Sequence, residues 1–307
     1  MLAANAAPAP PMDHPRAVVP YRPPVTSALV GINIAVFVLM TLRGVSLTNP
    51  GTAQLVNWGA NWGPLTLDGQ PWRALTSNYV HIGIVHILLN MWCLWDLGRL
   101  AERIFGGLTL FLIYTLCGLA GSIASLWMHP MVFGAGASGA IFGLAGALIA
   151  ALYLGKLPFP KQGLQRTLRS LLTFAGYNLF FGAVARGIDN SAHIGGLVMG
   201  LALGAILGQF LTHAPEERTR LERYVFLAAA LVLLAAGTFV KHKYRFVTTP
   251  DSAAEFFDSG TAKRPMVDVR TGEGVLTCWA GQRAHLPATA PPRPSVPRHH
   301  PRAPGFW

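Results

Sequence analysis

Two side chains that could together cleave a peptide bond lie at the starts of two apolar segments of this sequence. Ser138 stands in the run Gly-Ala-Ser-Gly-Ala-Ile-Phe that begins at Gly136, and His193 stands in Ser-Ala-His-Ile-Gly-Gly. A serine hydroxyl is a weak nucleophile until a base takes its proton, and histidine suits that role because its unperturbed pKa lies near neutrality. The pair predicts a Ser138–His193 dyad. No carboxylate lies within either segment, since Asp189 falls in the loop before His193.

A second polar group lies in an earlier apolar segment. His86 and Asn90 are four residues apart and therefore share one helical face, while His81 lies at the expected start of the same helix. Side-chain donors on one face could stabilise an oxyanion, because a tetrahedral intermediate needs donors already aimed at its oxygen. An interhelical hydrogen-bond pair is the alternative explanation.

Glycines accompany the two candidate catalytic residues. They flank the serine and follow the histidine on its own helical face: Gly136, Gly139, Gly196 and Gly200. Small residues four apart let membrane helices approach closely, so the pattern predicts close packing that brings Ser138 within hydrogen-bonding reach of His193. The same pattern leaves open that Ser138 is only a small packing residue.

The composition is that of a membrane protein. Of the 307 residues, 52% are hydrophobic and 12% charged, with a mean hydropathy of +0.40, whereas soluble domains carry about 25% charged residues. Apolar runs near the roughly 20 residues that cross a bilayer predict seven transmembrane helices: Thr26–Leu42, Val80–Leu100, Phe105–Met128, Ser138–Leu154, Leu171–Val184, Ala192–Leu211 and Tyr224–Val240. We therefore expect an all-α polytopic membrane protein.

Basic residues are unevenly distributed among the predicted connections. With a cytoplasmic N terminus, eleven lie on the inner side (Arg16, Arg22, Arg99, Arg103, Lys156, Lys161, Arg166, Arg169, Arg218, Arg220 and Arg223) and three on the outer side (Arg43, Arg73 and Arg186). The positive-inside rule favours this orientation, which places the candidate site in the outer half of the bilayer. The cations are scattered among loops, so the net charge of +11 does not indicate a nucleic-acid partner.

The sequence divides into four expected regions. They are a Pro-rich cytoplasmic segment (1–25) without a signal-peptide core, a six-helix catalytic core (26–212), a connecting segment with a seventh transmembrane helix (213–243), and a Pro/Arg-rich disordered tail (244–307). Cys93, Cys117 and Cys278 form no C-x-x-C pair, and the histidines lack an H-E-x-x-H motif. We therefore expect neither a metal site nor a cofactor.

Taken in order, these motifs resemble those of the rhomboid family of intramembrane serine proteases. The resemblance covers about residues 57–208 and rests on Trp72-Arg73, His81-x4-His86-x3-Asn90, Glu102, Gly136-Ala-Ser-Gly and Ala192-His193-x-x-Gly196-x-x-x-Gly200. It implies a rhomboid-like six-helix bundle plus one additional C-terminal transmembrane helix.

The resemblance also implies a role for each motif. Ser138 would be the nucleophile and His193 the general base, with His86, Asn90 and the Ser138 backbone N–H forming the oxyanion hole. Trp72-Arg73 would belong to an outer loop in the membrane interface, and the fifth helix would be a lateral gate for substrate. Phe142 departs from members that carry tyrosine at this position, so it offers no hydroxyl.

The expected function is hydrolysis of a peptide bond in or next to the transmembrane segment of single-span membrane proteins within the lipid bilayer. We expect a multi-pass protein of a bacterial inner membrane. One alternative is a non-catalytic rhomboid-like protein that binds transmembrane helices, although such proteins lack the serine and histidine in part or whole. Another is a transporter with a histidine proton path, which predicts inverted repeats; the sequence has no corresponding pair of segments.

Overall fold

The computed structural model describes residues 22–156, 161–185, 187–244, 266–267 and 274–275. Almost all of the predicted N-terminal segment (1–25) and tail (244–307) therefore lies outside the described residues, including Cys278. From the tail, two two-residue strands are described: β1 (Met266–Val267) pairs antiparallel with β2 (Gly274–Val275).

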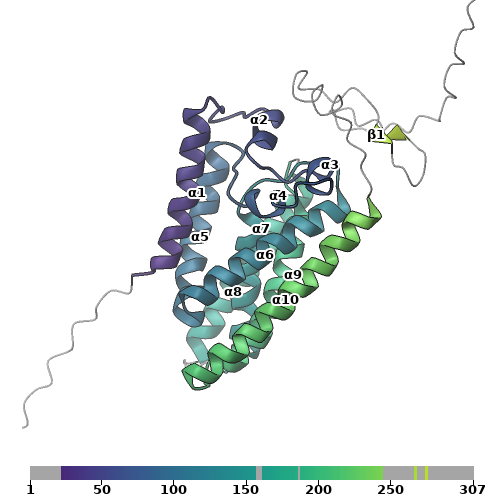
Figure 1. The fold of residues 1–307 in the computed structure, drawn as a ribbon. Helices are drawn as coiled ribbons and strands as arrows, with labels where there is room; N and C mark the ends of the chain where they lie inside the picture. Colours follow the sequence, from purple (N-terminus) through teal and green to yellow (C-terminus); the bar gives the residue numbers. More distant parts are fainter. Residues whose placement is uncertain (1–21, 157–160, 186, 245–265, 268–273, 276–307) are drawn as a thin grey trace, which may run out of the picture.

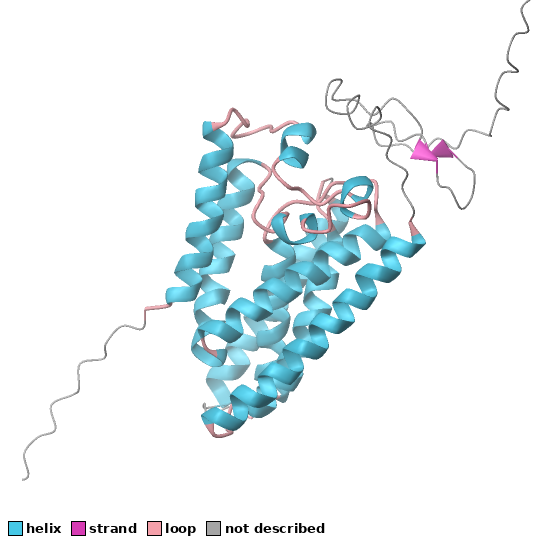
Figure 2. Ribbon diagram, viewed as in Figure 1, coloured by secondary structure: helices cyan, strands magenta, loops and turns pink. Residues whose placement is uncertain are grey.

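Seven long helices lie where the sequence predicts transmembrane segments (Figures 1 and 2). They are α1 (Pro24–Leu42), α5 (Gly83–Phe105), α6 (Gly107–Met128), α7 (Ser138–Leu154), α8 (Lys161–Val184), α9 (Asn190–Phe210) and α10 (Pro215–Lys243). Among the described helices, α1, α6, α9 and α10 are long and apolar enough to span a membrane by length and composition, and α7 is a shorter apolar helix. The prediction of an all-α polytopic membrane protein is confirmed.

Three predicted helix starts were wrong by three residues or more. Helix α10 begins at Pro215 and not at Tyr224, because the charged residues of its first turns lower the local hydropathy without breaking the helix. Helix α8 begins ten residues before the predicted Leu171, because the basic residues of its first turns interrupt the apolar run without breaking the helix. Helix α5 begins at Gly83 and not at Val80, since Gly83 has φ +81°, a conformation that glycine adopts at little cost. His81, which was expected at the start of this helix, therefore precedes it.

Three short helices fill the connection between α1 and α5: α2 (Thr52–Asn57), α3 (Gly63–Thr66) and α4 (Arg73–Thr76). Figure 1 shows them gathered at one end of the long helices. This connection is joined to the α6–α7 loop by backbone hydrogen bonds. Asn61 and Gly134 exchange two of them (2.8 and 2.7 Å), and Gly63 N–H donates to Pro130 O (2.9 Å). The connection is therefore a folded part of the protein that touches the segment preceding Ser138.

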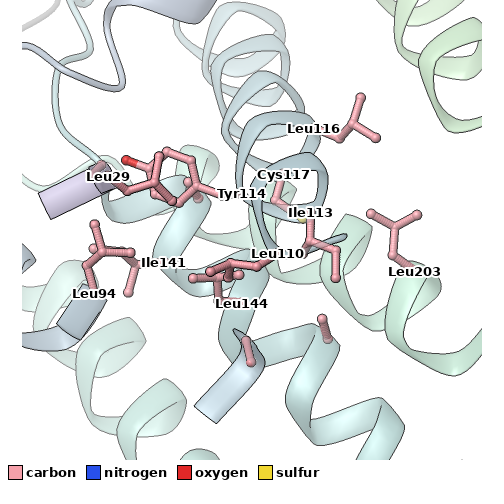
Figure 3. Packing of buried hydrophobic residues seen from close by; sticks show 14 of the residues in the cluster. Leu29, Leu94, Leu110, Ile113, Tyr114, Leu116, Cys117, Ile141, Leu144 and Leu203 are labelled. Atoms are coloured by element: carbon pink, nitrogen blue, oxygen red, sulfur yellow. The ribbon is translucent and has the colours of Figure 1, made fainter. Parts of the chain in front are cut away.

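Helix α7 lies at the centre of the bundle. Its side chains Ile141 and Leu144 belong to one buried apolar cluster with residues of four neighbouring helices (Figure 3): Leu29 of α1, Leu94 of α5, Leu110, Ile113, Tyr114, Leu116 and Cys117 of α6, and Leu203 of α9. A helix that is apolar on every side is one that other helices surround. The helix is thus buried from Gly139 to Leu148, while Ser138 at its N terminus is only partly buried.

Helices α7 and α9 approach closely enough for their backbones to touch. A Cβ added at Gly196 would overlap the carbonyl oxygen of Gly139, and one added at Gly200 would overlap that of Gly143. Glycine permits this approach because it has no side chain to separate the helices. The contact fixes the two helices in register, so their N-terminal ends lie beside each other.

Glu102 joins α1 to α5. Its carboxylate accepts hydrogen bonds from the backbone N–H of Val25 (3.0 Å) and of Thr26 (2.8 Å), and from the Thr26 hydroxyl (2.6 Å). These amides belong to the first turn of α1, where they lack intrahelical partners, and the helix dipole favours a negative charge there. Glu102 is 2% exposed, so this buried carboxylate is balanced by a helix terminus.

Candidate active site

The structure places Ser138 and His193 in direct contact. Ser138 is the first residue of α7, and its Oγ lies 2.9 Å from His193 Nε2 in the first turn of α9. A hydroxyl that donates to this nitrogen can lose its proton to it. His193 Nδ1 is buried with no hydrogen-bond partner among the described residues, so no carboxylate there accepts a hydrogen bond from the imidazole. When the Ser138 hydroxyl donates to Nε2, a neutral imidazole carries its proton on Nδ1.

Phe142 holds the imidazole from one side. Its ring stacks on His193 with centroids 4.3 Å apart and an angle of 13° between the planes. Phe142 in turn contacts Phe174 of α8, with centroids 5.7 Å apart. The phenyl ring thus contacts the His193 imidazole by stacking alone, without the hydroxyl that a tyrosine would offer.

Asp189 lies closer to the site than its place in a loop suggested. It is the N-cap of α9: its Oδ1 accepts a hydrogen bond from Ala192 N–H (3.1 Å), and its backbone carbonyl accepts one from His193 N–H (3.3 Å). Aspartate directly before an apolar helical run is a standard N-cap signal, which could have identified this role from the sequence. Asp189 fixes the turn that carries His193.

We expect Asp189→Ala to destabilise the protein by about 1 kcal/mol through loss of the cap and to slow the reaction of Ser138 with a fluorophosphonate by about tenfold through displacement of His193. Asn is an equally good N-cap residue, so Asp189→Asn should retain the parent reactivity. Thermal unfolding and labelling rates measure both effects. Equal losses in the two variants would contradict the capping role and indicate that the charge itself matters.

His86 lies against the backbone that precedes Ser138. A Cβ added at Gly136 would meet the Cε1 and Nε2 atoms of the His86 ring, and Gly136 has φ +129°, so only glycine fits this position without strain. Ile82 N–H donates to His86 Nδ1 (3.3 Å). A neutral His86 therefore carries its proton on Nε2, the nitrogen that faces Gly136.

Asn90 shares the face of His86, and its Nδ2 donates to the His86 backbone carbonyl (3.0 Å). Its amide nitrogen is thus engaged within α5 in this structure. Sequence spacing predicted the shared face, but it could not predict this local bond, which competes with donation to a substrate.

His81 supports the start of α7 from the loop before α5. Its side chain is fully buried, its ring centroid lies 5.3 Å from that of His86, and its Nε2 accepts a hydrogen bond from Ala137 N–H (3.5 Å). Burial and, to a smaller extent, the neighbouring His86 together lower the pKa of His81 to about 3, so the ring is neutral. Gly136, the residue before Ala137, is also held by a hydrogen bond, which its N–H donates to Ser77 O (2.9 Å).

Trp72 and Arg73 differ in exposure. Arg73 is 5% exposed and donates to the carbonyls of Val56 and Ala60 and to Gln70 Oε1 (2.7 Å), and burial lowers the pKa of its guanidinium below the usual value. The buried Arg73 side chain thus joins separate parts of the α1–α5 connection by hydrogen bonds. Trp72 is 49% exposed and lies under the Arg73 guanidinium at 4.7 Å. Among the described residues, no group of three His, Cys, Asp or Glu side chains could hold a metal ion.

Known proteins share the part of the chain that holds this site. The Rhomboid domain profile matches residues 68–210. Rhomboid protease GluP of Bacillus subtilis is 41% identical over 216 residues, which are 70% of this chain and 40% of that protein. RHOMBOID-like protein 7 of Arabidopsis thaliana is 34% identical over 209 residues (68% and 62%). RHOMBOID-like protein 6, mitochondrial, of the same plant is 34% identical over 215 residues (66% and 69%). The chain spans less than two thirds of the first two relatives.

Proposed function

This chain belongs to the rhomboid family, and on that premise we propose that it is an intramembrane serine endopeptidase. It hydrolyses a peptide bond in or next to the transmembrane segment of single-span membrane proteins. The observation that carries the proposal is the 2.9 Å contact between Ser138 Oγ and His193 Nε2, within a helix pair whose backbones touch. The similarity to a protein named rhomboid protease supports the same activity.

In the first half of the reaction, Ser138 Oγ attacks the scissile carbonyl carbon while His193 Nε2 takes the hydroxyl proton. The tetrahedral intermediate collapses, the C–N bond breaks, and His193 returns the proton to the leaving amine. In the second half, water attacks the acyl-enzyme, His193 takes a water proton, and the proton returns to Ser138 as the acid leaves. One base therefore serves both halves of the reaction.

Two donors are available to the oxyanion. The backbone N–H of Ser138 is in the first turn of α7, where it lacks an intrahelical acceptor and carries the partial positive charge of the helix terminus. The second donor is His86 Nε2–H, since Ile82 N–H occupies Nδ1. Donors fixed before the reaction cost no reorganisation in the transition state. Asn90 becomes a third donor when it exchanges its bond to the His86 carbonyl for one to the substrate.

Helix α8 is the gate through which substrate reaches the dyad. It is held near its outer end by a hydrogen bond from Asn190 Nδ2 to Leu179 O (3.0 Å) and further along by the Phe142–Phe174 contact. Much of its remaining surface consists of exposed large side chains: Leu172, Tyr177, Phe180, Phe181 and Val184. Because a substrate helix hides its carbonyls in its own hydrogen bonds, the segment to be cleaved must unwind at this entrance.

The N terminus lies in the cytoplasm of a bacterium, and the site lies in the outer half of the inner membrane. The excess of Lys and Arg on the predicted inner side supports this orientation. The N-terminal ends of α5, α7 and α9 lie together with the α1–α5 connection, which carries the half-exposed Trp72 at the position expected of an interfacial aromatic.

The experiment that tests the proposal is cleavage of a tagged single-span reporter in lipid vesicles by the parent chain and by Ser138→Ala. We expect one new product from the parent and none from the variant, with both proteins equally folded. Undiminished cleavage by Ser138→Ala would overturn the mechanism. A parent that captures the reporter but neither cleaves it nor reacts with a fluorophosphonate would identify a rhomboid-like binding protein.

A further inference from the structure

Helix α10 is attached to the bundle at its inner end and along its middle. Glu222 accepts hydrogen bonds from Thr109 Oγ1 of α6 (2.8 Å) and from Arg218 Nε (2.7 Å), and Arg218 also donates to the carbonyl of Phe105. Further along, three apolar residues of α10 are buried in the main core: Phe226, Ala229 and Leu233. These contacts join α10 to α6, to the end of α5 and to the main core.

The outer end of α10 makes contacts of a different kind. Val240 is fully buried in a separate small cluster with Leu67, which follows α3, and with Leu126 of α6. Tyr244 Oη donates to the backbone carbonyl of Trp127 (2.8 Å), and the Lys243 ammonium lies 5.2 Å from the centre of the Trp127 ring. Figure 1 shows this end of α10 beside α3. The helix therefore reaches both the α1–α5 connection and the residue where α6 gives way to the next loop.

The two residues that the outer end of α10 contacts, Leu67 and Trp127, are both connected to the loop that precedes Ser138. Leu67 N–H donates to the carbonyl of Gly63, and Gly63 N–H donates to that of Pro130 in the α6–α7 loop. Four residues further along this loop, Gly134 is paired with Asn61. The loop then continues through Gly136, against His86, to Ser138. Leu67 and Trp127 are therefore both joined to the start of the loop that ends at Ser138.

We propose that the outer end of α10, through Val240 and Tyr244, positions the loop that precedes Ser138. The seventh helix thereby contributes to turnover and does not serve only as an additional membrane span. This inference rests on the proposed function, because the loop it positions supplies the backbone around the oxyanion. Val240 and Tyr244 are positioning residues, since neither touches the dyad.

The Tyr244 hydrogen bond and the burial of Val240 each stabilise the segment that they contact. Trp127 is among the last four residues of α6, whose carbonyls lack intrahelical donors, and the Tyr244 hydroxyl supplies one. Val240 fills the space between Leu67 and Leu126, and removal of a buried side chain leaves a cavity into which its neighbours relax only in part. Both changes loosen the α6–α7 loop at the end opposite Ser138.

The test uses the full chain in detergent or lipid vesicles, with Val240→Ala and Tyr244→Phe. Each has a matched control on the same helix: Leu233→Ala removes a similarly buried side chain in the main core, and Tyr224→Phe removes a hydroxyl from a side chain that is 65% exposed. We expect kcat for reporter cleavage and the rate of fluorophosphonate labelling to fall about tenfold in the two test variants, with KM within about twofold of the parent. The controls should retain kcat, although Leu233→Ala lowers Tm.

Hydrogen exchange gives a readout that does not depend on catalysis. The amides of Gly134 and Gly136 donate to the carbonyls of Asn61 and Ser77, and their exchange should accelerate about tenfold in Val240→Ala but not in Leu233→Ala. Unchanged exchange and unchanged kcat in both test variants would overturn the positioning role. A parent without activity but with this exchange pattern would overturn the proposed function while leaving the structural coupling in place.

Discussion

Replacing His193 with alanine is expected to lower kcat for reporter cleavage by about 10⁴-fold or more, as loss of a catalytic histidine does in other serine hydrolases. The imidazole is the group in contact with Ser138 Oγ, and no other titratable side chain bonds to this hydroxyl among the described residues. Without the base, Ser138 remains a protonated hydroxyl and a poor nucleophile. The measurement is initial cleavage rate in lipid vesicles at matched protein concentration.

The double variant Ser138→Ala/His193→Ala provides the control. Residues that act as one unit are not additive, so the double variant should be no slower than either single variant. Thermal unfolding should show that all three remain folded. Additive losses, or a His193→Ala variant that retains more than about one tenth of the parent rate, would contradict a dyad.

Replacing Gly200 with alanine is expected to destabilise the protein by about 3 kcal/mol or more, because the new methyl group would overlap the carbonyl oxygen of Gly143 in a core that cannot expand freely. In a helix with open space, the same substitution stabilises by about 1 kcal/mol. The sign of the effect therefore depends on the contact between α7 and α9.

Gly31→Ala is the matched control, since nothing lies within 4 Å of a Cβ at that position in α1. Denaturation in detergent should show a large loss for Gly200→Ala and little change or a gain for Gly31→Ala. Fluorophosphonate labelling should fall in the first variant only, because separated helices carry Ser138 away from His193. Equal stabilities of the two variants would mean that α7 and α9 are not in backbone contact.

The sequence predicted the fold well where apolar runs were uninterrupted. Helix α7 has the predicted bounds, Ser138–Leu154, because apolar residues fill the whole segment and Gly155 ends it. The start of α8 was missed because Lys161, Arg166 and Arg169 lower the local hydropathy while remaining good helix formers. The folding of residues 52–76 into three short helices was also missed, since it depends on hydrogen bonds to the distant α6–α7 loop.

In the candidate site, too, residue spacing predicted some features and could not predict others. Spacing predicted that His86 and Asn90 share a face and that glycines would allow α7 and α9 to approach. It could not predict that Asn90 bonds to its own helix, that His81 receives the amide of Ala137, or that Val240 reaches Leu67. The contacts of His81 and Val240 join residues that are far apart in the chain, and the spacing of Asn90 does not decide between a bond to its own helix and one to a substrate.

The most direct test of the central claim is the site of fluorophosphonate attachment. The full chain in lipid vesicles is treated with the probe, digested, and mapped by mass spectrometry, alongside His193→Ala. An adduct on Ser138 in the parent, with labelling of the variant slowed by about 10³-fold or more, is the result that a Ser138–His193 dyad predicts. Attachment at another residue, or equal labelling of Ser138 in the two proteins, would contradict it.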